Sequence, residues 1–327
     1  EHSFPTRRSS DLATTAGAFV VSSRLSQQRQ MVVNSATVHY LYYPFEDAYI
    51  QIPSGGLAGT FGAGACGTST AIGPSGSATA GSTTTLTTNL TLARSLAGYQ
   101  IEITGGPGAG DIRTIAYNTV GANGVITVTA SFSAAITASS TYRLITPRYY
   151  ILNAGTLASG SFKVYDFALN TWTTLSNTGL PATVGTDGKL IATPSYGDNG
   201  VELNFATGQA TAGAASTLTN SAKAWATNQW ANFQIKITGG TGAGQIRTIA
   251  SNTGTAITVS AAWTTAPDST STYHIEGNDD FLYFMGNAAV TLYRYSISGN
   301  TWTTLAPGAA RTAPPVSGMS GHWVYGV

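Results

Sequence analysis

Two short stretches of the chain alternate apolar and polar residues around a turn, and their sequences are closely similar. The first, VYDFALNTWTTL, covers residues 164–175, and the second, LYRYSISGNTWTTL, covers residues 292–305. Alternation with a period of two is typical of strands with one buried face. An Asn or Gly-Asn between the arms tolerates the positive φ that a tight turn needs. Each stretch therefore predicts a β-hairpin.

An aromatic pair seven residues apart marks both hairpins, and a third, weaker copy precedes them. The third copy lies in residues 31–53, MVVNSATVHYLYYPFEDAYIQIP, and has a Tyr in place of the Trp. The signature residues of the three copies are Tyr42, Tyr49, Tyr165, Trp172, Tyr295 and Trp302. We expect these rings to pack between neighbouring sheets and not to bind a ligand, because each buries a large apolar area.

A longer stretch also occurs twice. Residues 78–144, with QIEITGGPGAGDIRTIA and VITVTA, align with residues 210–275, with QIKITGGTGAGQIRTIA and AITVSA. One register relates both stretches and both hairpins, so a unit of roughly 130 residues is duplicated in tandem. Alternating runs separated by Gly-rich turns predict short antiparallel strands. We call these stretches the first and second modules.

The stretches around the hairpins resemble the blades of Kelch-type β-propellers. The resemblance rests on YYILNAGTLASGSFKVYDFALNTWTTLSNTGLP and FLYFMGNAAVTLYRYSISGNTWTTLAPGAA, which pair an apolar strand with a later Tyr and Trp. The Gly pair of the family is degraded to Ala154-Gly155 and Met285-Gly286. The resemblance implies an all-β fold of Kelch-like blades, each module being inserted between consecutive strands of a blade.

The modules resemble a small β module of tailed-bacteriophage virion proteins. The matching words are GTGAGQIRTI, AAWTTAPD and the closing STY in the second copy, and GPGAGDIRTI in the first. This resemblance implies a structural protein of a virion. It also implies partners that are other virion proteins or copies of the same chain.

The repeats divide the chain into six segments. Residues 1–12, EHSFPTRRSSDL, resemble sequencing-adapter read-through, and we expect them not to be native. The expected segments that follow are a first partial blade (13–77), the first module (78–146), a second blade (147–209), the second module (210–275), and a third blade with the start of another (276–327). Only three hairpins are visible, whereas a closed propeller needs four or more blades, so either the chain is a fragment, which its C-terminal sequence favours, or closure requires other chains.

Composition removes several classes of function. The chain has 327 residues, of which 42% are hydrophobic and only 9% charged, and its net charge is +1. It therefore lacks the basic surface that nucleic acid requires, and no run of apolar residues reaches the length of a membrane helix. The single cysteine, Cys66, excludes an intrachain disulfide and is expected to be a small buried residue.

The glycine-rich runs and the arginines that follow them suggest anion binding. GGPGAG and GGTGAG lead into a strand and not into a helix, and no Lys-Ser/Thr follows them, so hairpin turns are the better prediction. Arg113 and Arg247 occupy the same position in the two modules. We expect a structural cross-strand partner for each, with carboxylate or phosphate binding as the alternative.

Other polar residues give no spacing that defines a site. The acidic turns Glu46-Asp47, Asp198-Asn199 and Asp279-Asp280 offer oxygen ligands to Ca²⁺ but match no calcium loop. The histidines His39, His274 and His322 lack metal-ligand spacing. No Ser/His/Asp set is identifiable either. We therefore predict turn residues, no cofactor and no catalysis, with Ca²⁺ at an acidic turn as the alternative.

Three hypotheses from different classes remain. The first is a non-enzymatic structural or interaction protein of a tailed-phage virion, made in the host cytoplasm and assembled as an oligomer. The second is a bacterial surface adhesin or carbohydrate-binding propeller. The third is a fragment of a propeller hydrolase or oxidase. For the second, the aromatic side chains that would stack on sugar rings are Trp225, Trp230, Trp263 and Tyr117.

Overall fold

The computed structural model describes residues 18–21, 30–34, 38–43, 48–53, 65–153, 155–158, 160–184, 188–193, 195, 204–286 and 291–305. Every regular element within these ranges is a β-strand, which confirms the all-β prediction. The chain forms two compact units. The hairpin unit takes the chain up to residue 71, residues 147–193 and residues 280–326; the module unit takes residues 72–146 and 194–279.

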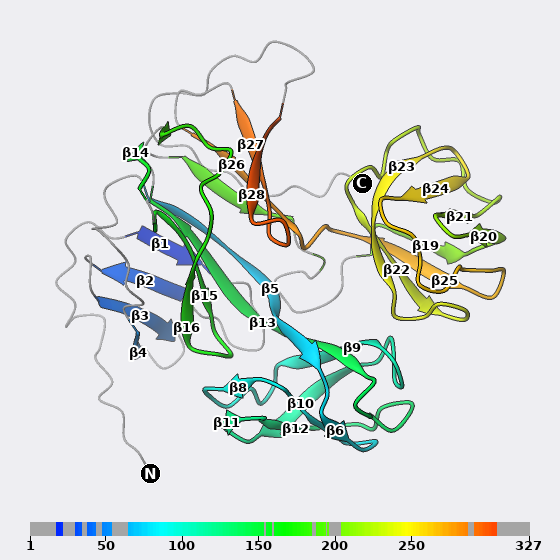
Figure 1. Cartoon of the computed structure of the whole chain (residues 1–327), viewed down its shortest axis with the longest axis horizontal. Coiled ribbons are helices and arrows are strands. Elements are labelled where there is room, and N and C mark those ends of the chain that lie inside the picture. The colour runs from blue at the N-terminus through cyan, green and yellow to red at the C-terminus, as the bar shows by residue number, and fades with distance from the viewer. Residues whose placement is uncertain are drawn as a thin grey trace. The chain divides into compact units, whose positions relative to one another are not determined.

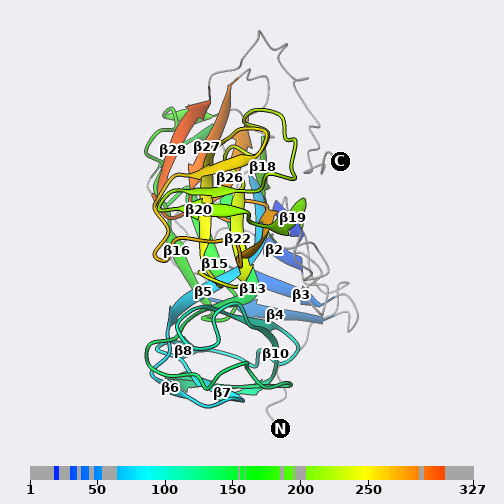
Figure 2. The same cartoon turned by 90° about the vertical axis from the view of Figure 1, so that its right-hand side faces the viewer.

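Three groups of four hydrogen-bonded strands make up most of the hairpin unit (Figures 1 and 2). The first sheet is β1 (Ala18–Val21), β2 (Gln30–Asn34), β3 (Val38–Tyr43) and β4 (Ala48–Ile52). The second is β5 (Cys66–Ser77), β13 (Thr141–Leu152), β15 (Phe162–Asp166) and β16 (Thr171–Thr174). Because β13 also pairs with β9 (Gln100–Gly105), these four strands are part of a nine-stranded sheet that continues into the first module. The third is β18 (Lys189–Ala192), β26 (Phe281–Met285), β27 (Leu292–Ser296) and β28 (Thr301–Leu305). A short pair, β14 (Gly155–Thr156) with β17 (Thr183–Val184), accompanies them.

Each group is a meander in which strands pair in chain order, and the modules interrupt the second and third meanders after their first strand. Strand β5 pairs with β13 beyond the first module, and β18 pairs with β26 beyond the second. The strands on either side of each module are therefore hydrogen-bonded partners, as expected for a module inserted between consecutive strands. The described strands form no closed propeller ring.

The aromatic signature residues face each other directly across the three hairpins. The cross-strand pairs are Tyr42 with Tyr49, Tyr165 with Trp172, and Tyr295 with Trp302, with ring centroids 4.6, 5.2 and 5.0 Å apart. Such pairs on one face of a ladder stabilise an antiparallel sheet and fix its register. The spacing of seven residues is therefore the distance along the chain between two partners in one rung.

A side-chain hydrogen bond closes the turn of the second and third hairpins. The hydroxyl of Tyr165 donates to Asn170 Oδ1 at 2.6 Å, and that of Tyr295 donates to Asn300 Oδ1, also at 2.6 Å. Asn170 and Asn300 have φ angles of 55° and 47°, in the left-handed region that Asn tolerates better than most residues. The turn residue thus sets the backbone and also holds the Tyr ring.

The Trp of each of these hairpins bonds to the hairpin before it. Trp172 Nε1 donates to the carbonyl oxygen of Pro53 at 2.7 Å, and Trp302 Nε1 donates to that of Ser176 at 3.1 Å. Pro53 is the fourth residue after Tyr49 and Ser176 the fourth after Trp172, so the two acceptors are equivalent. Asn300 Oδ1 also accepts the Ser176 N–H at 2.8 Å. The same contact therefore joins successive hairpins twice.

The core of the hairpin unit collects side chains from the second and third sheets. Phe162 lies 4.8 Å from Tyr295 and 5.1 Å from Trp302 between ring centroids. The buried members are Cys66, Tyr150, Leu152, Phe162, Val164, Val184, Leu190, Ala192, Leu282, Phe284, Tyr295 and Trp302. Burial raises the pKa of the Cys66 thiol to about 12, which fits the expected inert apolar role.

The two modules have equivalent strand orders, drawn in cyan to green and in yellow in Figure 1. The first contains β6 (Ala80–Gly81), β7 (Thr85–Thr87), β8 (Thr91–Leu92), β9 (Gln100–Gly105), β10 (Ile112–Asn118), β11 (Gly121–Ala122) and β12 (Val125–Val128). The second contains β19 (Ala206–Gln209), β20 (Ala212–Ala214), β21 (Thr217–Thr219), β22 (Gln234–Gly239), β23 (Ile246–Asn252), β24 (Ala256–Val259) and β25 (Thr272–Glu276). The sheet order is β13-β9-β10-β12-β7-β6 in the first and β25-β22-β23-β24-β21-β20 in the second.

Both modules contain an equivalent hydrogen bond between a buried Tyr and an Asn side chain. The hydroxyl of Tyr142 donates to Asn89 Oδ1 at 2.9 Å, and the equivalent Asn220 Nδ2 donates to the hydroxyl of Tyr273 at 2.9 Å. These Tyr residues come from the repeated STY word that closes each module. A buried phenol needs such a partner, since an unsatisfied hydroxyl in an apolar core is costly.

We predict that Trp302 contributes both through its buried ring and through its N–H bond. Trp302 is 3% exposed. The Trp302→Ala variant should therefore lose about 3–5 kcal/mol of unfolding free energy. Trp302→Phe keeps most of the apolar contact but not the bond to Ser176, and should lose about 1–2 kcal/mol. Urea unfolding of the full chain measures both.

Trp172→Phe is the matched control, because Trp172 makes the equivalent bond to Pro53 but is only half-buried. Trp172→Phe should lower the unfolding free energy by about 1 kcal/mol. Equal stabilities of the Trp302→Ala variant and the wild type would contradict the assignment of this ring to the core.

Candidate functional site

The central strands of the two modules differ in sequence at one position, and that position is charged. Strand β9 reads QIEITG and β22 reads QIKITG, which places Glu102 and Lys236 at equivalent sites. The flanking isoleucines, Ile101 and Ile103 in the first copy, are 0% exposed and form the module core. Because side chains alternate along a strand, Glu102 and Lys236 lie on the opposite face. Both are nevertheless buried.

Glu102 pairs with two cations. Its Oε2 accepts a hydrogen bond from Arg143 Nε, the residue directly opposite on β13, and its Oε1 lies 2.5 Å from Lys236 Nζ of the second module. Arg143 Nη1 also lies 3.0 Å from Asp279 Oδ2. Charges at equivalent positions of the duplicated modules therefore meet, and their divergence to Glu and Lys makes the contact attractive.

Asp279 and Glu276 extend the cluster at the end of β25. Ser195 donates to Asp279 through its backbone N–H at 2.7 Å and through its hydroxyl at 2.5 Å. Glu276 Oε2 lies 2.9 Å from His274 Nε2, while its Oε1 has no hydrogen-bond partner among the described residues. The ionic cluster, as we call it, consists of Glu102, Arg143, Lys236, His274, Glu276 and Asp279.

Burial and ion pairing shift the carboxyl groups of the cluster in different directions. Burial alone would raise the pKa of Glu102, but the charges of Arg143 and Lys236 outweigh it and hold the pKa below its usual value. Burial prevails at Glu276 and at Asp279 and raises the pKa of each, and the two carboxyl groups also repel one another. The protein therefore keeps Glu102 ionised and makes ionisation of Glu276 costly.

The ionic cluster is a joint between the modules and not an open reaction site. Glu102, Ser195 and Glu276 are all 0% exposed, so a solvent-borne substrate does not reach them. The glycine-rich runs meet beside it: a Cβ built on Gly244 would lie 2.9 Å from the Ala109 Cβ and 3.1 Å from the Gly110 nitrogen. Only glycine permits this approach.

A cavity of about 640 Å³ lies in the module unit next to this joint. Both glycine-rich runs contribute to its wall, and its polar lining comes from Thr104, Thr141, Arg143, Gln245, Arg247, Thr264 and Thr265. Its volume is in the range of small-molecule sites, although its lining is more polar than usual for them.

The glycine-rich runs are turns between strands, as the sequence predicts. GGPGAG connects β9 to β10 and GGTGAG connects β22 to β23. Three glycines in each run have φ between 71° and 91°, at equivalent positions: Gly106, Gly108 and Gly110 in the first, and Gly240, Gly242 and Gly244 in the second. A phosphate-binding loop would need a helix after the run, and a strand follows instead.

Arg113 and Arg247 each hold a loop of their own module. Arg113 Nε donates to the carbonyl oxygen of Ser131 at 2.7 Å, and Arg247 Nε donates to that of Ala262 at 2.9 Å. Each also donates through Nη1 to the carbonyl oxygen of the preceding residue at 2.9 Å. Both arginines therefore have structural partners, among them a backbone carbonyl in the loop after β12 for Arg113 and in the loop after β24 for Arg247.

The structure corrects one of the four aromatic residues proposed for sugar stacking. Trp263 is 5% exposed and lies in the core of the second module, so its face is not available to a ligand. Trp225 and Trp230 are half-buried against that core, and Tyr117 is 59% exposed.

The acidic turns and histidines form no metal centre in the part of the chain that the structure describes. Asp280 accepts the hydroxyl of Ser296 and the N–H of Ser298, both at 2.6 Å, and so closes a turn. His39 is buried beside Trp172, and burial together with Lys163 lowers its pKa to about 4. Glu46-Asp47, Asp198-Asn199 and His322 lie outside the described residues.

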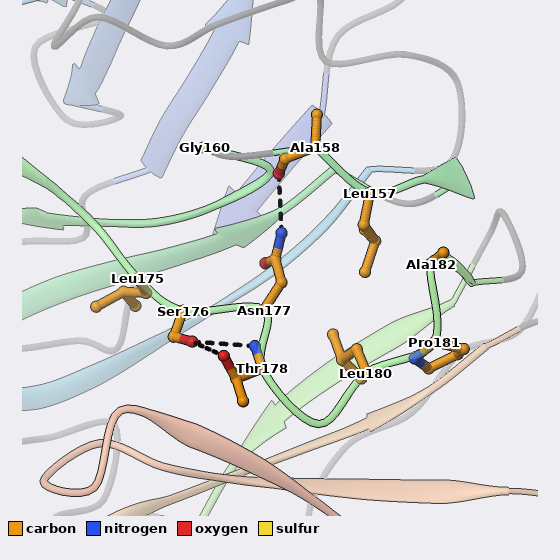
Figure 3. Close-up of a pocket in the computed structure, with 10 residues that line it drawn as sticks. All are labelled: Leu157, Ala158, Gly160, Leu175, Ser176, Asn177, Thr178, Leu180, Pro181 and Ala182. Carbon is orange, nitrogen blue, oxygen red and sulfur yellow. Dashed lines mark hydrogen bonds between the residues drawn. The ribbon is translucent and has the colours of Figure 1, made fainter.

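A second cavity, of about 370 Å³, lies in the hairpin unit where the chain leaves β16 (Figure 3). Asn177 Nδ2 donates to the carbonyl oxygen of Ala158 at 2.8 Å, and the hydroxyl of Ser176 lies 2.8 Å from Thr178 Oγ1. The remaining wall consists of Leu, Ala, Gly and Pro residues, so its described lining carries no charged or titratable group. We assign it no chemistry.

Sequence reasoning did not find the ionic cluster. Alternation along QIEITG marks Glu102 as a solvent-facing residue, and only packing of one module on the other buries it. A signal was nonetheless present, because the duplicated strands QIEITG and QIKITG exchange a Glu for a Lys while the flanking residues stay the same. In a chain with 9% charged residues, that exchange marks a position where opposite charges are useful.

No protein-family model, curated protein or solved structure matches the chain significantly. Among the described residues, there is also no helix of the length and apolarity needed to cross a membrane. The functional argument therefore depends on the residues themselves.

We predict that removing the Glu102 carboxylate costs more than removing its partner lysine. Glu102→Gln leaves the buried Arg143 and Lys236 without their shared carboxylate, and should lower the unfolding free energy by about 3–5 kcal/mol. Lys236→Met should cost less, because Arg143 still neutralises Glu102. Urea unfolding of both variants and of the double variant measures the coupling, which should be about 1–3 kcal/mol. Strict additivity would contradict the Glu102–Lys236 pairing.

We predict that Glu276→Gln stabilises the protein at neutral and higher pH. The folded-state pKa of Glu276 is raised above its usual 4.5. Its contribution is therefore fully present below about pH 4.5 and is lost as the pH rises through the folded-state pKa. Gln removes the cost of ionisation, so at pH 8 the variant should have a higher unfolding temperature than the wild type. The corresponding gain in unfolding free energy should be on the order of 1 kcal/mol.

Thermal unfolding from pH 4 to pH 9 measures this difference, which should shrink towards the acid end. A variant that is less stable than the wild type at pH 8 but equal at pH 4 would show instead that Glu276 gains stability by ionising.

Proposed function

We propose that this chain is a non-catalytic structural and interaction protein of a tailed-phage virion, built from Kelch-like blades that carry inserted β modules. The observation that supports the blade architecture best is the repeated bond from a Trp indole to the exit of the preceding hairpin. Blades of propellers are four-stranded antiparallel sheets, and three four-stranded meanders follow one another along this chain. The Trp indole hydrogen bonds that join one sheet to the next are equivalent.

The position of the modules supports the same proposal. Each module enters after the first strand of a meander and returns to the second strand, so the meander is complete once the module is set aside. An insertion of this kind leaves the blade core intact, since its ends are adjacent strands. The module sequences, with GAGQIRTI and the closing STY, supply the resemblance to virion proteins.

The chemistry of the surface fits a mechanical role. Several charged side chains have partners within the protein. Glu102, Asp279 and Lys236 form ion pairs in the joint between the modules, and Asp280 accepts hydrogen bonds in a turn. A charge-poor exterior built from Thr, Ser and Gly makes contacts through hydroxyl and amide groups, which suits packing against identical copies or other particle proteins.

We predict that the chain is incorporated into phage particles. In a lysate of a host that carries the gene, mass spectrometry should find its peptides in the density-gradient fraction that contains particles and DNA, in a constant ratio to the major capsid protein. Peptides confined to the host-cell or soluble fraction would contradict the proposal.

The enzymatic alternative is tested on the same material. Purified chain, folded by thermal unfolding criteria, should give no turnover with glycoside or ester substrates. Measurable turnover that is lost with the folded state would favour the propeller hydrolase instead.

A further inference from the structure

Duplication gives the arginines of the two modules different electrostatic surroundings. In the first module, Arg113 Nη2 bonds to Asp111 Oδ1 at 2.8 Å, which neutralises the guanidinium. In the second module, the residue equivalent to Asp111 is Gln245, in GAGQIRTI against GAGDIRTI. Arg247 Nη2 donates to the hydroxyl of Thr264 at 2.9 Å instead. No carboxylate pairs with Arg247 among the described residues.

Arg247 is therefore a partly desolvated cation bonded only to neutral groups. Its three acceptors are the carbonyl oxygens of Ala262 and Ile246 and the hydroxyl of Thr264. Burial lowers the pKa of its guanidinium, which reflects this cost. A guanidinium has five N–H groups, so two remain for a further acceptor. An anionic acceptor would offset the desolvation most effectively.

Arg247 lines the cavity of about 640 Å³ in the module unit. The rest of the polar lining is neutral or already neutralised, because Arg143 pairs with Glu102 and Asp279. Two hydroxyls lie together on the wall, with Thr104 Oγ1 2.9 Å from Thr141 Oγ1. Hydroxyl groups, which both donate and accept, are suited to the hydroxyls of a sugar.

We propose that this cavity binds a small saccharide that carries a carboxylate, with Arg247 holding the carboxylate and the threonines holding ring hydroxyls. The volume suits one or two sugar units. A monoanion matches the single uncompensated cation. A phosphate dianion would leave one negative charge uncompensated and is therefore disfavoured. This ligand goes beyond the proposed virion role, which stands or falls separately.

The experiment is a calorimetric titration of the full purified chain at neutral pH. The probes are sodium glucuronate, glucose as the neutral sugar of the same shape, and sodium phosphate and sodium sulfate as inorganic anions. Glucuronate should bind, and glucose, phosphate and sulfate should bind at least about tenfold more weakly, because each lacks either the monoanionic carboxylate or the hydroxyls.

Three variants locate the site. Arg247→Gln should weaken glucuronate binding at least about tenfold. Gln245→Asp supplies the carboxylate that the first module has at the equivalent position, so it should neutralise Arg247 and weaken binding to a similar degree while keeping the fold. Asp111→Asn is the matched control in the first module and should leave binding unchanged. Thermal unfolding establishes that each variant is folded.

Several results would overturn the proposal. They are absence of glucuronate binding, equal binding of glucose, preference for phosphate or sulfate, and unchanged binding by the folded Gln245→Asp variant. Should Arg247→Gln not fold, Gln245→Asp and Asp111→Asn alone decide, since Asp already occupies the equivalent position in the first module.

Discussion

The indole N–H of the repeated tryptophan is the interaction on which the order of the hairpin unit depends. Within a hairpin, the Trp ring faces a Tyr in the same rung, and that Tyr is tied to the turn Asn. The N–H then points out of the hairpin and bonds to the chain leaving the previous one. Each hairpin is thus fixed internally by its aromatic pair and externally by this directional bond, to which the third hairpin adds the bond from the Ser176 N–H to Asn300 Oδ1. Repeats of this kind bury their faces only against neighbours.

Buried charge imposes the corresponding constraint on the module unit. Duplication first produces two modules with the same face, and identical charges on that face would repel when the modules pack. The change to Glu102 in one copy and Lys236 in the other turns repulsion into a pair at 2.5 Å. Taking ions out of water is costly, so a single mismatch at this joint is more damaging than on the surface. The Glu102–Lys236 pair therefore determines which face of the first module packs against which face of the second.

The sequence was informative wherever a local pattern determined the structure. The Tyr-to-Trp spacing predicted hairpins because it counts residues around one turn, and the glycine-rich runs predicted turns because their positive φ requires glycine at Gly106 and Gly240. Long-range packing could not be predicted from the sequence. Glu102 has the pattern of a surface residue, and Trp263 sits in a loop sequence, yet tertiary contacts bury both. The pairing of β5 with β13 was predictable, because a module inserted between consecutive strands leaves those two strands paired.

The site shows the same division. Arg113 and Arg247 were recognised as equivalent from the repeat, but the consequence of having Asp111 in one copy and Gln245 in the other emerged only when both side chains were seen with their partners. The charge-poor composition pointed to interaction without catalysis, and the buried ionic cluster agrees with a joint that holds two modules together.

Hydrogen exchange at the tryptophan indoles, followed by NMR, tests the central claim most directly. Trp172 is only half-buried, so its indole proton is slow to exchange only if it is hydrogen-bonded to Pro53. The account predicts strong protection at Trp172 and at Trp302, with each resonance assigned by its loss in the corresponding Trp→Phe variant. Exchange of the Trp172 indole proton at the rate of a free indole would contradict the bond that joins successive hairpins.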